Sequence, residues 1–456
     1  IASVNVSKDA VSNSLYGSRA AGGVVMITTK GSKGASKVQK MSVSYDGYYG
    51  IRKIARMPDL MDAEEFIDYR FARFTTLETT KYDGSGRAGI DANGVPHYTI
   101  TKANQETAFM KRIGGADYRD SKVYEMMMAG ESYDWTDLVT RTAAQQNHFI
   151  SMDGSTEKAT YRLGFGYQNE ENVFLYNDYS RFNIKGSYDA KLSKVLEAGL
   201  SVNMAYSIKE DFQTNSSYSP YETAFLFNPF ISPYDENGKI LLQPASNAPF
   251  ETTAGFTSTI SPLIDLADKN YTDETKKYNV LTSFYLRANI MENMKFTTTF
   301  SPNFQYSRQG IFNATGLNDN NKEGSSYYFS TGMNSAQVET KQRLNWTWDS
   351  QLDYNKTIGD HSFSGMGLFS MYRSQLEAYK MKGFNIPNDK LSFHALEKAA
   401  SSDKTIESSY TESTMVSGAF RVNYSYKGRY MATATVRADG SSRFAEGNRW
   451  GWFPSA

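Results

Sequence analysis

The sequence predicts an all-β fold, namely a transmembrane antiparallel β-barrel, from three observations. Apolar and polar residues alternate with period two over many segments of ten or more residues. The connections between these segments alternate between short and long. No run approaches the roughly 18–20 consecutive apolar residues of a transmembrane helix, so strands are the elements that could cross a bilayer.

The alternation is clearest in the segment around 343–354. One face carries Leu344, Trp346, Trp348, Leu352 and Tyr354, and the other carries Arg343, Asn345, Thr347, Asp349, Gln351 and Asp353. Similar patterns occupy 158–168, 182–192, 196–207 and 416–425. A tilted strand of about ten residues crosses an apolar band of about 25 Å, whereas strands of soluble proteins average only about five or six residues. The length of the pattern therefore favours a barrel in a membrane.

Eleven such strands are predicted. They start near residues 38, 145, 158, 181, 195, 277, 294, 340, 360, 412 and 429. The strand near 360 has the poorest alternation, because Met366 and Leu368 fall on its polar face.

The connections predict the sidedness of the barrel. Tight turns are expected at 154–157, 191–194, 292–294, 357–360 and 426–429, and long polar connections at 51–144, 209–276, 309–338 and 373–411, with a shorter one at 170–180. Outer-membrane barrels have short turns in the periplasm and long loops outside, while a sandwich or propeller has no reason to alternate in this way. Within the first connection, 62–70 predicts a short helix with Asp62 as its N-cap.

The composition argues against several functions. Lys plus Arg and Asp plus Glu both number 49, so no net charge indicates a nucleic-acid partner. The absence of Cys excludes disulfides, thiolate zinc sites and a thiol nucleophile. The four histidines, His97, His148, His361 and His394, lie far apart in the sequence without metal-ligand spacing. Segment 17–22 lacks the Lys-Ser/Thr ending of a phosphate loop. We therefore expect no catalytic residue, metal or cofactor, and no enzyme.

Residues 1–30 depart from the barrel pattern, and they carry a family resemblance. Lys8, Asp9, Tyr16, Gly17, Arg19, Ala20, Gly23, Val24, Ile27, Thr28 and Lys30 resemble the closing stretch of the plug domain in the SusC/RagA family of TonB-dependent outer-membrane transporters. Gly22 stands where that family commonly has Asn. A second stretch of the family is similar to Asp439, Gly440, Ser441, Ser442, Arg443 and Phe444, followed by 451–455. A third is similar to 135–137 and 146–154.

The resemblance implies a 22-stranded barrel closed by a plug, of which this chain would hold about half. Residues 1–34 would be the C-terminal end of an α+β plug, and 35–456 the N-terminal half of the barrel, with about 11 strands. The expected location is the outer membrane of a Gram-negative, Bacteroidetes-like cell, in contact with its lipid. The expected partners are a SusD-like surface lipoprotein and the TonB-ExbB-ExbD complex, which acts through a TonB box. Because the chain opens at Ile1 without a signal sequence, that box and the signal peptide are expected upstream.

Candidate substrate contacts are aromatic residues of the long loops. Tyr218, Tyr221, Tyr327 and Tyr328 could stack on the apolar faces of sugar rings, although tyrosine also forms the interfacial girdles of barrels. Charged residues expected in the lumen, where they would pair with the plug and neighbouring strands, are Arg162, Lys185, Asp189, Arg343, Asp349 and Arg421.

The sequence leaves the imported substrate open. The leading hypothesis is TonB-dependent import of an oligosaccharide or peptide. A siderophore or cobalamin receptor of the same architecture is the close alternative. A passive porin or adhesin barrel is disfavoured by residues 1–30, and a soluble carbohydrate-binding β-protein is disfavoured by the strand lengths.

Overall fold

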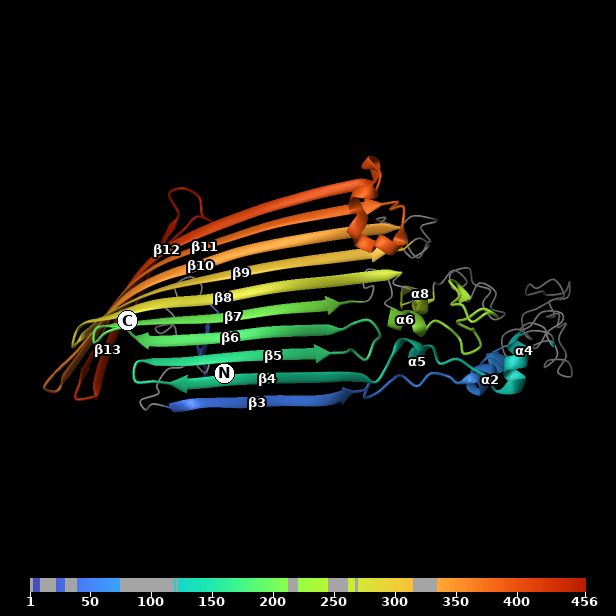
Figure 1. Cartoon of the computed structure of the whole chain (residues 1–456), viewed down its shortest axis with the longest axis horizontal. Coiled ribbons are helices and arrows are strands. Elements are labelled where there is room, and N and C mark those ends of the chain that lie inside the picture. Colours follow the sequence, from blue (N-terminus) through green and yellow to red (C-terminus); the bar gives the residue numbers. More distant parts are fainter. Residues whose placement is uncertain are drawn as a thin grey trace, which may run out of the picture.

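The computed structural model describes residues 3–8, 22–28, 39–73, 119, 122–211, 220–244, 261–266, 270–314 and 334–456. Its main element is one twelve-stranded antiparallel sheet whose strands follow in chain order from β3 to β14 (Figure 1). The strands are β3 (Gln39–Arg52), β4 (Ala143–Ser155), β5 (Ala159–Glu170), β6 (Tyr179–Lys191), β7 (Leu196–Glu210), β8 (Tyr271–Met291), β9 (Met294–Asn313), β10 (Ser335–Ile358), β11 (His361–Phe384), β12 (Lys404–Tyr426), β13 (Tyr430–Ser441) and β14 (Trp450–Ser455). The predicted all-β, antiparallel fold class is confirmed.

A second, two-stranded sheet precedes this one. β1 (Ser3–Ser7) and β2 (Val24–Thr28) pair antiparallel, with Ser3 opposite Thr28 and Ser7 opposite Val24. Of the plug-like motif, only Lys8, Gly23 and positions 24–28 fall among the described residues. Asp9, Tyr16, Gly17, Arg19, Ala20 and Lys30 lie outside the described residues. The division at residue 34 stays a prediction.

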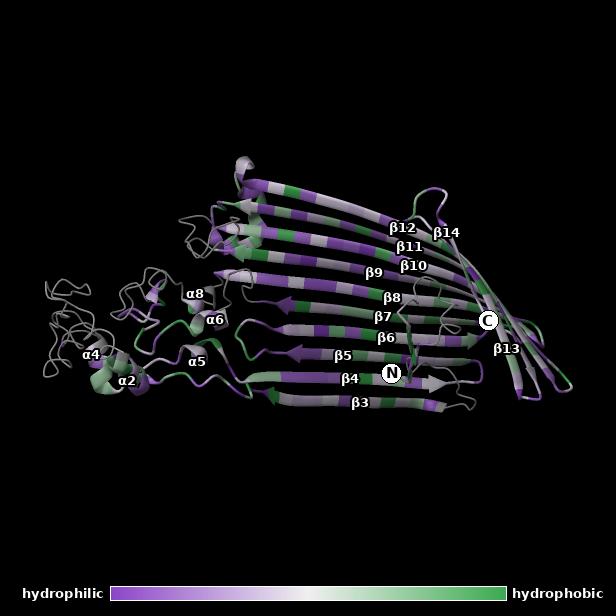
Figure 2. Cartoon of the chain, turned by 180° about the vertical axis from the view of Figure 1, so that it is seen from behind, coloured by the Kyte–Doolittle hydropathy of each residue, from purple (hydrophilic) through white to green (hydrophobic). Residues whose placement is uncertain are grey.

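The register of the large sheet keeps the two faces in phase from strand to strand. Residues directly opposite one another on paired strands lie on the same face. One such row runs through Tyr45, Ile150, Phe165, Ile184, Met204, Val280, Phe304 and Leu344. This row belongs to a continuous apolar face. The opposite, polar face collects the Ser, Thr, Asn, Gln and charged residues, and the colours alternate accordingly along each strand (Figure 2).

The two ends of the sheet differ as predicted. The turn end carries the tight connections, which join β4 to β5, β6 to β7, β8 to β9, β10 to β11 and β12 to β13. The loop end carries the long connections and the helices (Figure 1). These helices are α2 (Ala63–Arg73), α4 (Lys122–Ala129), α5 (Trp135–Val139), α6 (Pro220–Ala224) and α8 (Pro262–Leu266). Among the described residues, no helix is both long and apolar enough to cross a membrane.

The sheet holds twelve strands rather than the eleven that the sequence predicts. The additional strand, β14, has only six residues and pairs with β13 from Gly440↔Trp450 to Thr435↔Ser455. The period-two contrast is hidden in this strand, because it is short and carries aromatic residues on both faces, Trp452 on one and Phe453 on the other.

The predicted loops at 309–338 and 373–411 are too long. Strands β8 to β12 extend over 20–24 residues, whereas β3 to β7 have 12–15. Beyond Arg373, β11 carries polar residues on both faces, such as Gln375 and Ser374. Where water covers both faces the alternation disappears, yet the hydrogen-bond ladder continues. β11 itself, the strand with the poorest predicted pattern, pairs along its length with β10.

The predicted helix near 62–70 is confirmed as α2, and its start is a capping box. The Glu65 backbone N–H donates to Asp62 Oδ1 at 2.9 Å, and the Asp62 N–H donates to Glu65 Oε2 at 3.2 Å. Two otherwise orphaned amides at the helix start are thereby satisfied.

Side chains of the loop end form a core of their own. Trp135 of α5 is 2 % exposed, stacks on Phe227 with ring centroids 4.2 Å apart, and donates its indole N–H to the Ile231 carbonyl at 3.0 Å. Val139, Ala224 and Leu263 also belong to this cluster. The loop segments therefore pack as ordered structure above the strands.

Candidate functional site

The polar face carries a network that joins three strands near the middle of the sheet. Tyr285 of β8 donates its hydroxyl to Asp189 of β6 at 2.6 Å, across the intervening strand β7. Gly199 of β7 lies directly between them in the register. A Cβ at Gly199 would lie 2.2 Å from the Tyr285 ring and 2.5 Å from Asp189 Oδ1. Only glycine leaves the room that this hydrogen bond needs.

The same network continues towards the turn end. Arg287 donates to Glu197 Oε2 at 3.0 Å, and its guanidinium lies 5.0 Å from the centre of the Tyr285 ring. Both side chains of this ion pair are partly exposed, so screening by water keeps its contribution to stability small. The network holds neighbouring strands in register on the polar face.

Residues of the 439–444 motif build the hairpin between β13 and β14. Arg437 Nε donates to Asp439 Oδ1 at 2.7 Å, and the two side chains are only 6 % and 5 % exposed. Beside this pair, Arg421 Nε donates to Thr435 Oγ1 at 2.9 Å. The motif thus begins with a buried ion pair on the polar face.

The remaining motif residues close the loop against β12. The Ser442 N–H donates to the Thr414 carbonyl at 3.0 Å, and the Thr414 N–H donates to Ser442 Oγ at 2.9 Å. Arg443 Nη2 donates to Ser413 Oγ at 3.4 Å. Gly440 lies against Trp450, whose ring a Cβ at that position would approach to 2.9 Å. Phe444 is exposed.

Of the four candidate substrate tyrosines, the structure describes only Tyr221. Its ring lies 4.7 Å from Phe174 and 4.8 Å from Phe225, and its hydroxyl donates to Met57 Sδ at 3.7 Å. Tyr221 is therefore a packed aromatic residue of the loop end. Tyr218, Tyr327 and Tyr328 lie outside the described residues.

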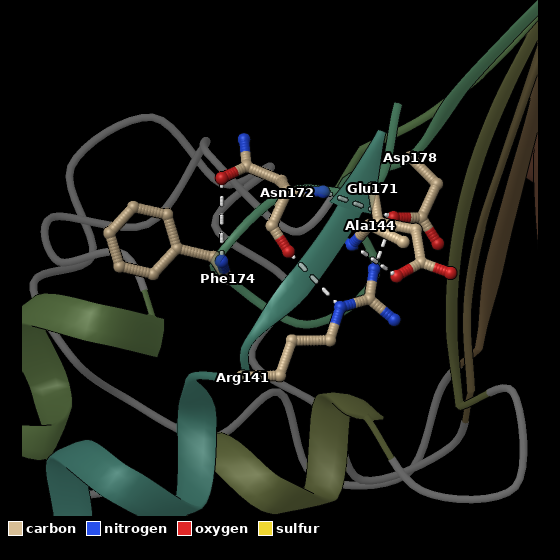
Figure 3. A network of polar contacts seen from close by, with 6 residues as sticks. All are labelled: Arg141, Ala144, Glu171, Asn172, Phe174 and Asp178. Atoms are coloured by element: carbon tan, nitrogen blue, oxygen red, sulfur yellow. Dashed lines mark hydrogen bonds and ion pairs between the residues drawn. The ribbon is translucent and has the colours of Figure 1, made fainter. Parts of the chain in front are cut away.

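A set of polar contacts, here called the polar clasp, fixes the connection between β5 and β6 (Figure 3). Arg141 forms an ion pair with Asp178 and donates from Nε to the Asn172 carbonyl at 3.0 Å. Glu171 accepts from the Ala144 N–H at 2.9 Å. The clasp ties 171–178 to the start of β4, and it positions Phe174 against Tyr221.

The predicted charged residues all lie on the polar face, in different surroundings. Asp189 and Arg421 make the hydrogen bonds given above. Lys185 lies 5.8 Å from the centre of the Phe149 ring. Arg162 lies opposite Asp153 and Ser187, Arg343 opposite Gln305 and Leu376, and Asp349 opposite Thr299 and Ser370.

At the loop end of β8, Asp273 accepts a hydrogen bond from Gln309 Nε2 at 2.8 Å. Burial raises the pKa of its carboxyl above the ordinary value, and the nearby Asp211 carboxylate raises it further, although the Gln309 hydrogen bond acts the other way. This carboxyl lies beyond the apolar part of the strands.

Two of the histidines lie on the apolar face among aromatic residues. His148 Nδ1 is 2.7 Å from the Tyr45 hydroxyl, and His361 Nδ1 is 2.8 Å from the Tyr424 hydroxyl. His394 packs on Phe393, and His97 lies outside the described residues. No group of three or more His, Cys, Asp or Glu in the described part of the chain is arranged to hold a metal ion.

Two hollows of about 590 and 740 Å³ open on the apolar face rather than on the polar one. Phe296, Leu352, Phe420 and Trp452 line one or both of them. Their lining is mostly apolar and suits hydrocarbon, so they are not a candidate substrate site.

The roles of Tyr285 and Gly199 are not predicted from the sequence. An aromatic residue at a polar-face position, between Ser283 and Arg287, was the available signal. Its partner lies 96 positions earlier in the chain, and only the register of three strands brings the two together.

The comparisons with known proteins agree with this geometry. No protein-family model matches the chain. A TonB-dependent receptor of Formosa agariphila is 27% identical over 456 residues, covering 100% of this chain and 40% of its own length. The TonB-dependent receptor SusC of Bacteroides thetaiotaomicron is 24% identical over 473 residues, covering 100% of this chain and 40% of its own length. The chain thus spans about two fifths of the length of these curated relatives.

A solved structure of the RagAB peptide transporter shares the fold. It superposes with a TM-score of 0.71 at 18% identity, covering 99% of this chain and 47% of that chain. The RagAB peptide importer in its open-open state gives a TM-score of 0.73 at 18% identity over the same shares. With twelve antiparallel strands, one apolar and one polar face, and TonB-dependent receptors aligned along its whole length, the chain is similar to TonB-dependent receptors of the SusC/RagA type.

Proposed function

We propose that the protein containing this chain is an active importer of the outer membrane, which moves an oligosaccharide or a peptide into the periplasm with TonB-derived energy. The observation that carries the proposal is the two-faced sheet, with one continuous apolar face and every long connection at one end. Such a sheet presents hydrocarbon to lipid on one side and a hydrated wall to a lumen on the other. The loop end would then lie outside the cell and the turn end in the periplasm.

This proposal assigns a role to each part of the chain. Residues 1–34 would close the plug and 35–456 would form part of the barrel wall. The ordered loop end around Trp135 and Tyr221 would bound the entrance, where Tyr218, Tyr327 and Tyr328 are further candidate contacts. The 439–444 hairpin would brace the wall. No residue is assigned to catalysis, because transport consists of binding and release.

Two partners are part of the proposal. A SusD-like surface lipoprotein would cover the entrance at the loop end, and the TonB-ExbB-ExbD complex would act from the periplasm on another part of the same protein. The kinship with SusC and the fold shared with a RagAB peptide transporter support both. The location would be the outer membrane of a Bacteroidetes-like cell.

Energy-dependent uptake tests the proposal. Cells that make the full-length protein should accumulate labelled oligosaccharide or oligopeptide, and a protonophore should abolish the accumulation. A deletion strain is the matched control. Uptake that persists without a proton gradient would favour a passive porin. Uptake confined to iron-siderophore complexes or cobalamin would favour the alternative receptor class.

A further inference from the structure

A cationic zone lies on the polar face, on the loop-end side of the Tyr285–Asp189 network. It consists of four neighbouring rows of residues that lie opposite one another across β5 to β12. Each strand contributes every second residue of its range, because only alternate residues lie on the polar face. Its positions are 162–168, 181–187, 201–207, 277–283, 301–307, 341–347, 372–378 and 409–415. The polar-face residues of these ranges include no Asp or Glu.

The zone nevertheless contains six cations. They are Arg162, Arg181, Lys185, Lys277, Lys341 and Arg343. Most of the other positions are neutral hydrogen-bonding residues, such as Asn203, Asn303 and Asn345. Among the polar-face residues of β5 to β12, acidic residues stand in other rows. At the edge of the zone, Asp46 of β3 and Asp153 of β4 lie in its rows, and Asp153 is opposite Arg162. Asp189, Asp349 and Asp439 share the next row towards the turn end.

The contacts of the cations neutralise the zone only in part. Lys341 pairs at 2.7 Å with Glu339, which stands in the next row towards the loop end. Lys185 lies over the Phe149 ring, and Arg181 Nε is buried with no hydrogen-bond partner in the described part of the chain. Within those same described residues, no carboxylate forms an ion pair with Lys185 or Lys277.

The spacing makes these charges act together. Arg181 and Lys277 share a row and are separated by one strand, β7, with Ser207 between them. Two steps of about 4.8 Å place their backbones about 10 Å apart, which is comparable to the Debye length of about 8–10 Å at physiological salt. The potentials of neighbouring cations therefore overlap, and an anion between two of them is attracted by both.

We propose that the cationic zone binds the anionic groups, carboxylate or sulfate, of an oligomeric substrate. This inference rests on the proposed import function and narrows its substrate class to acidic oligomers. The neutral amides and hydroxyls around the cations supply hydrogen bonds without competing charge, and the acidic row beneath limits the zone on the turn-end side.

Binding of labelled probes to the full-length protein in detergent tests the inference. The probes are oligogalacturonate and oligoglutamate, each compared with a neutral oligomer of similar length, maltooligosaccharide and oligoglutamine. We expect the anionic probe of one class to bind at least about tenfold more tightly than its neutral counterpart, and to weaken steeply between about 50 and 500 mM salt. Preference for oligogalacturonate assigns an acidic glycan, and preference for oligoglutamate an acidic peptide.

The variant Lys277→Glu should weaken binding of the preferred anionic probe by about tenfold or more and leave binding of the neutral probes unchanged. The matched control is Lys276→Glu, because Lys276 lies on the other face of the same strand, paired with Glu274 at 2.8 Å. Lys277→Gln gives a milder version if the charge reversal does not fold.

Three results would overturn the inference. Anionic probes could bind no more tightly than neutral ones or not at all, or Lys277→Glu could weaken both kinds equally. Lys277→Glu could also lower the thermal stability of the probe-free protein while probe binding stays intact, in which case the cations pair with another part of the same protein. The energy-dependent uptake of the proposed function can succeed under each of these results, so the two failures are distinguishable.

Discussion

Adding one methyl group at Gly199 should break the network on the polar face. In Gly199→Ala the new Cβ would lie 2.2 Å from the Tyr285 ring and 2.5 Å from Asp189 Oδ1, so the ring must move and the 2.6 Å hydrogen bond to Asp189 is lost. A hydrogen bond to a charged group contributes about 1.5–3 kcal/mol, and overpacking costs about 1–3 kcal/mol more. Alanine recovers about 0.5–1 kcal/mol of backbone entropy. We expect a net loss of about 2–4 kcal/mol.

The assay is the free energy of unfolding of the full-length protein in lipid vesicles, measured by urea titration. Gly367→Ala is the matched control, because a Cβ there meets no atom within 4 Å, and it should change stability by less than about 0.5 kcal/mol. In a Tyr285→Ala background the clash with the ring is removed and only the approach to Asp189 Oδ1 remains, so Gly199→Ala should cost much less than in the original protein. A neutral effect of Gly199→Ala alone, or the same loss in both backgrounds, would show that Gly199 is not needed to make room for the Tyr285 ring.

Three further predictions concern other parts of the chain. Asp439→Ala should cost about 3–5 kcal/mol in the same titration, because it removes the carboxylate that pairs with the buried Arg437 guanidinium, which is only 6 % exposed; an effect below about 1 kcal/mol would contradict this. Asp62→Ala should destabilise α2 by about 1 kcal/mol through loss of the capping box, seen as faster amide exchange in 63–67 but not in α5. Asp273→Asn should stabilise the loop end at neutral pH. Because the pKa of the Asp273 carboxyl is raised in the folded state, its contribution to stability is present below its unfolded pKa and is lost as pH rises through the folded pKa. A lower thermal unfolding temperature of the variant at pH 7 would contradict this.

The sequence predicts the strands well where the two faces meet different surroundings. In β10, Leu344 to Tyr354 alternate with polar residues, and this contrast fixes both the strand and its faces. The capping residue Asp62 predicts the start of α2 in the same local way. Such features depend on neighbours in the chain, which a single sequence displays.

Features that depend on register could not be predicted in this way. The extension of β11 beyond Arg373 is polar on both faces, so its pairing with β12 leaves no period-two signal. Tyr285 meets Asp189 only because β6, β7 and β8 align. Tyr221 was a candidate for its residue type alone, and its packing against Phe174 depends on the clasp of Arg141 and Asp178.

The most direct test of the account is the lipid exposure of alternate residues in β10. The 456 residues contain no cysteine, so a cysteine introduced at each of 347–352 is the one spin-labelling site within them; any cysteine elsewhere in the full-length protein is first replaced by serine. We expect labels at Trp348, Ser350 and Leu352 to be accessible to membrane-dissolved oxygen, and labels at Thr347, Asp349 and Gln351 to be accessible to a water-soluble relaxant. Accessibility without this period of two, or with the faces exchanged, would contradict a barrel wall between lipid and lumen.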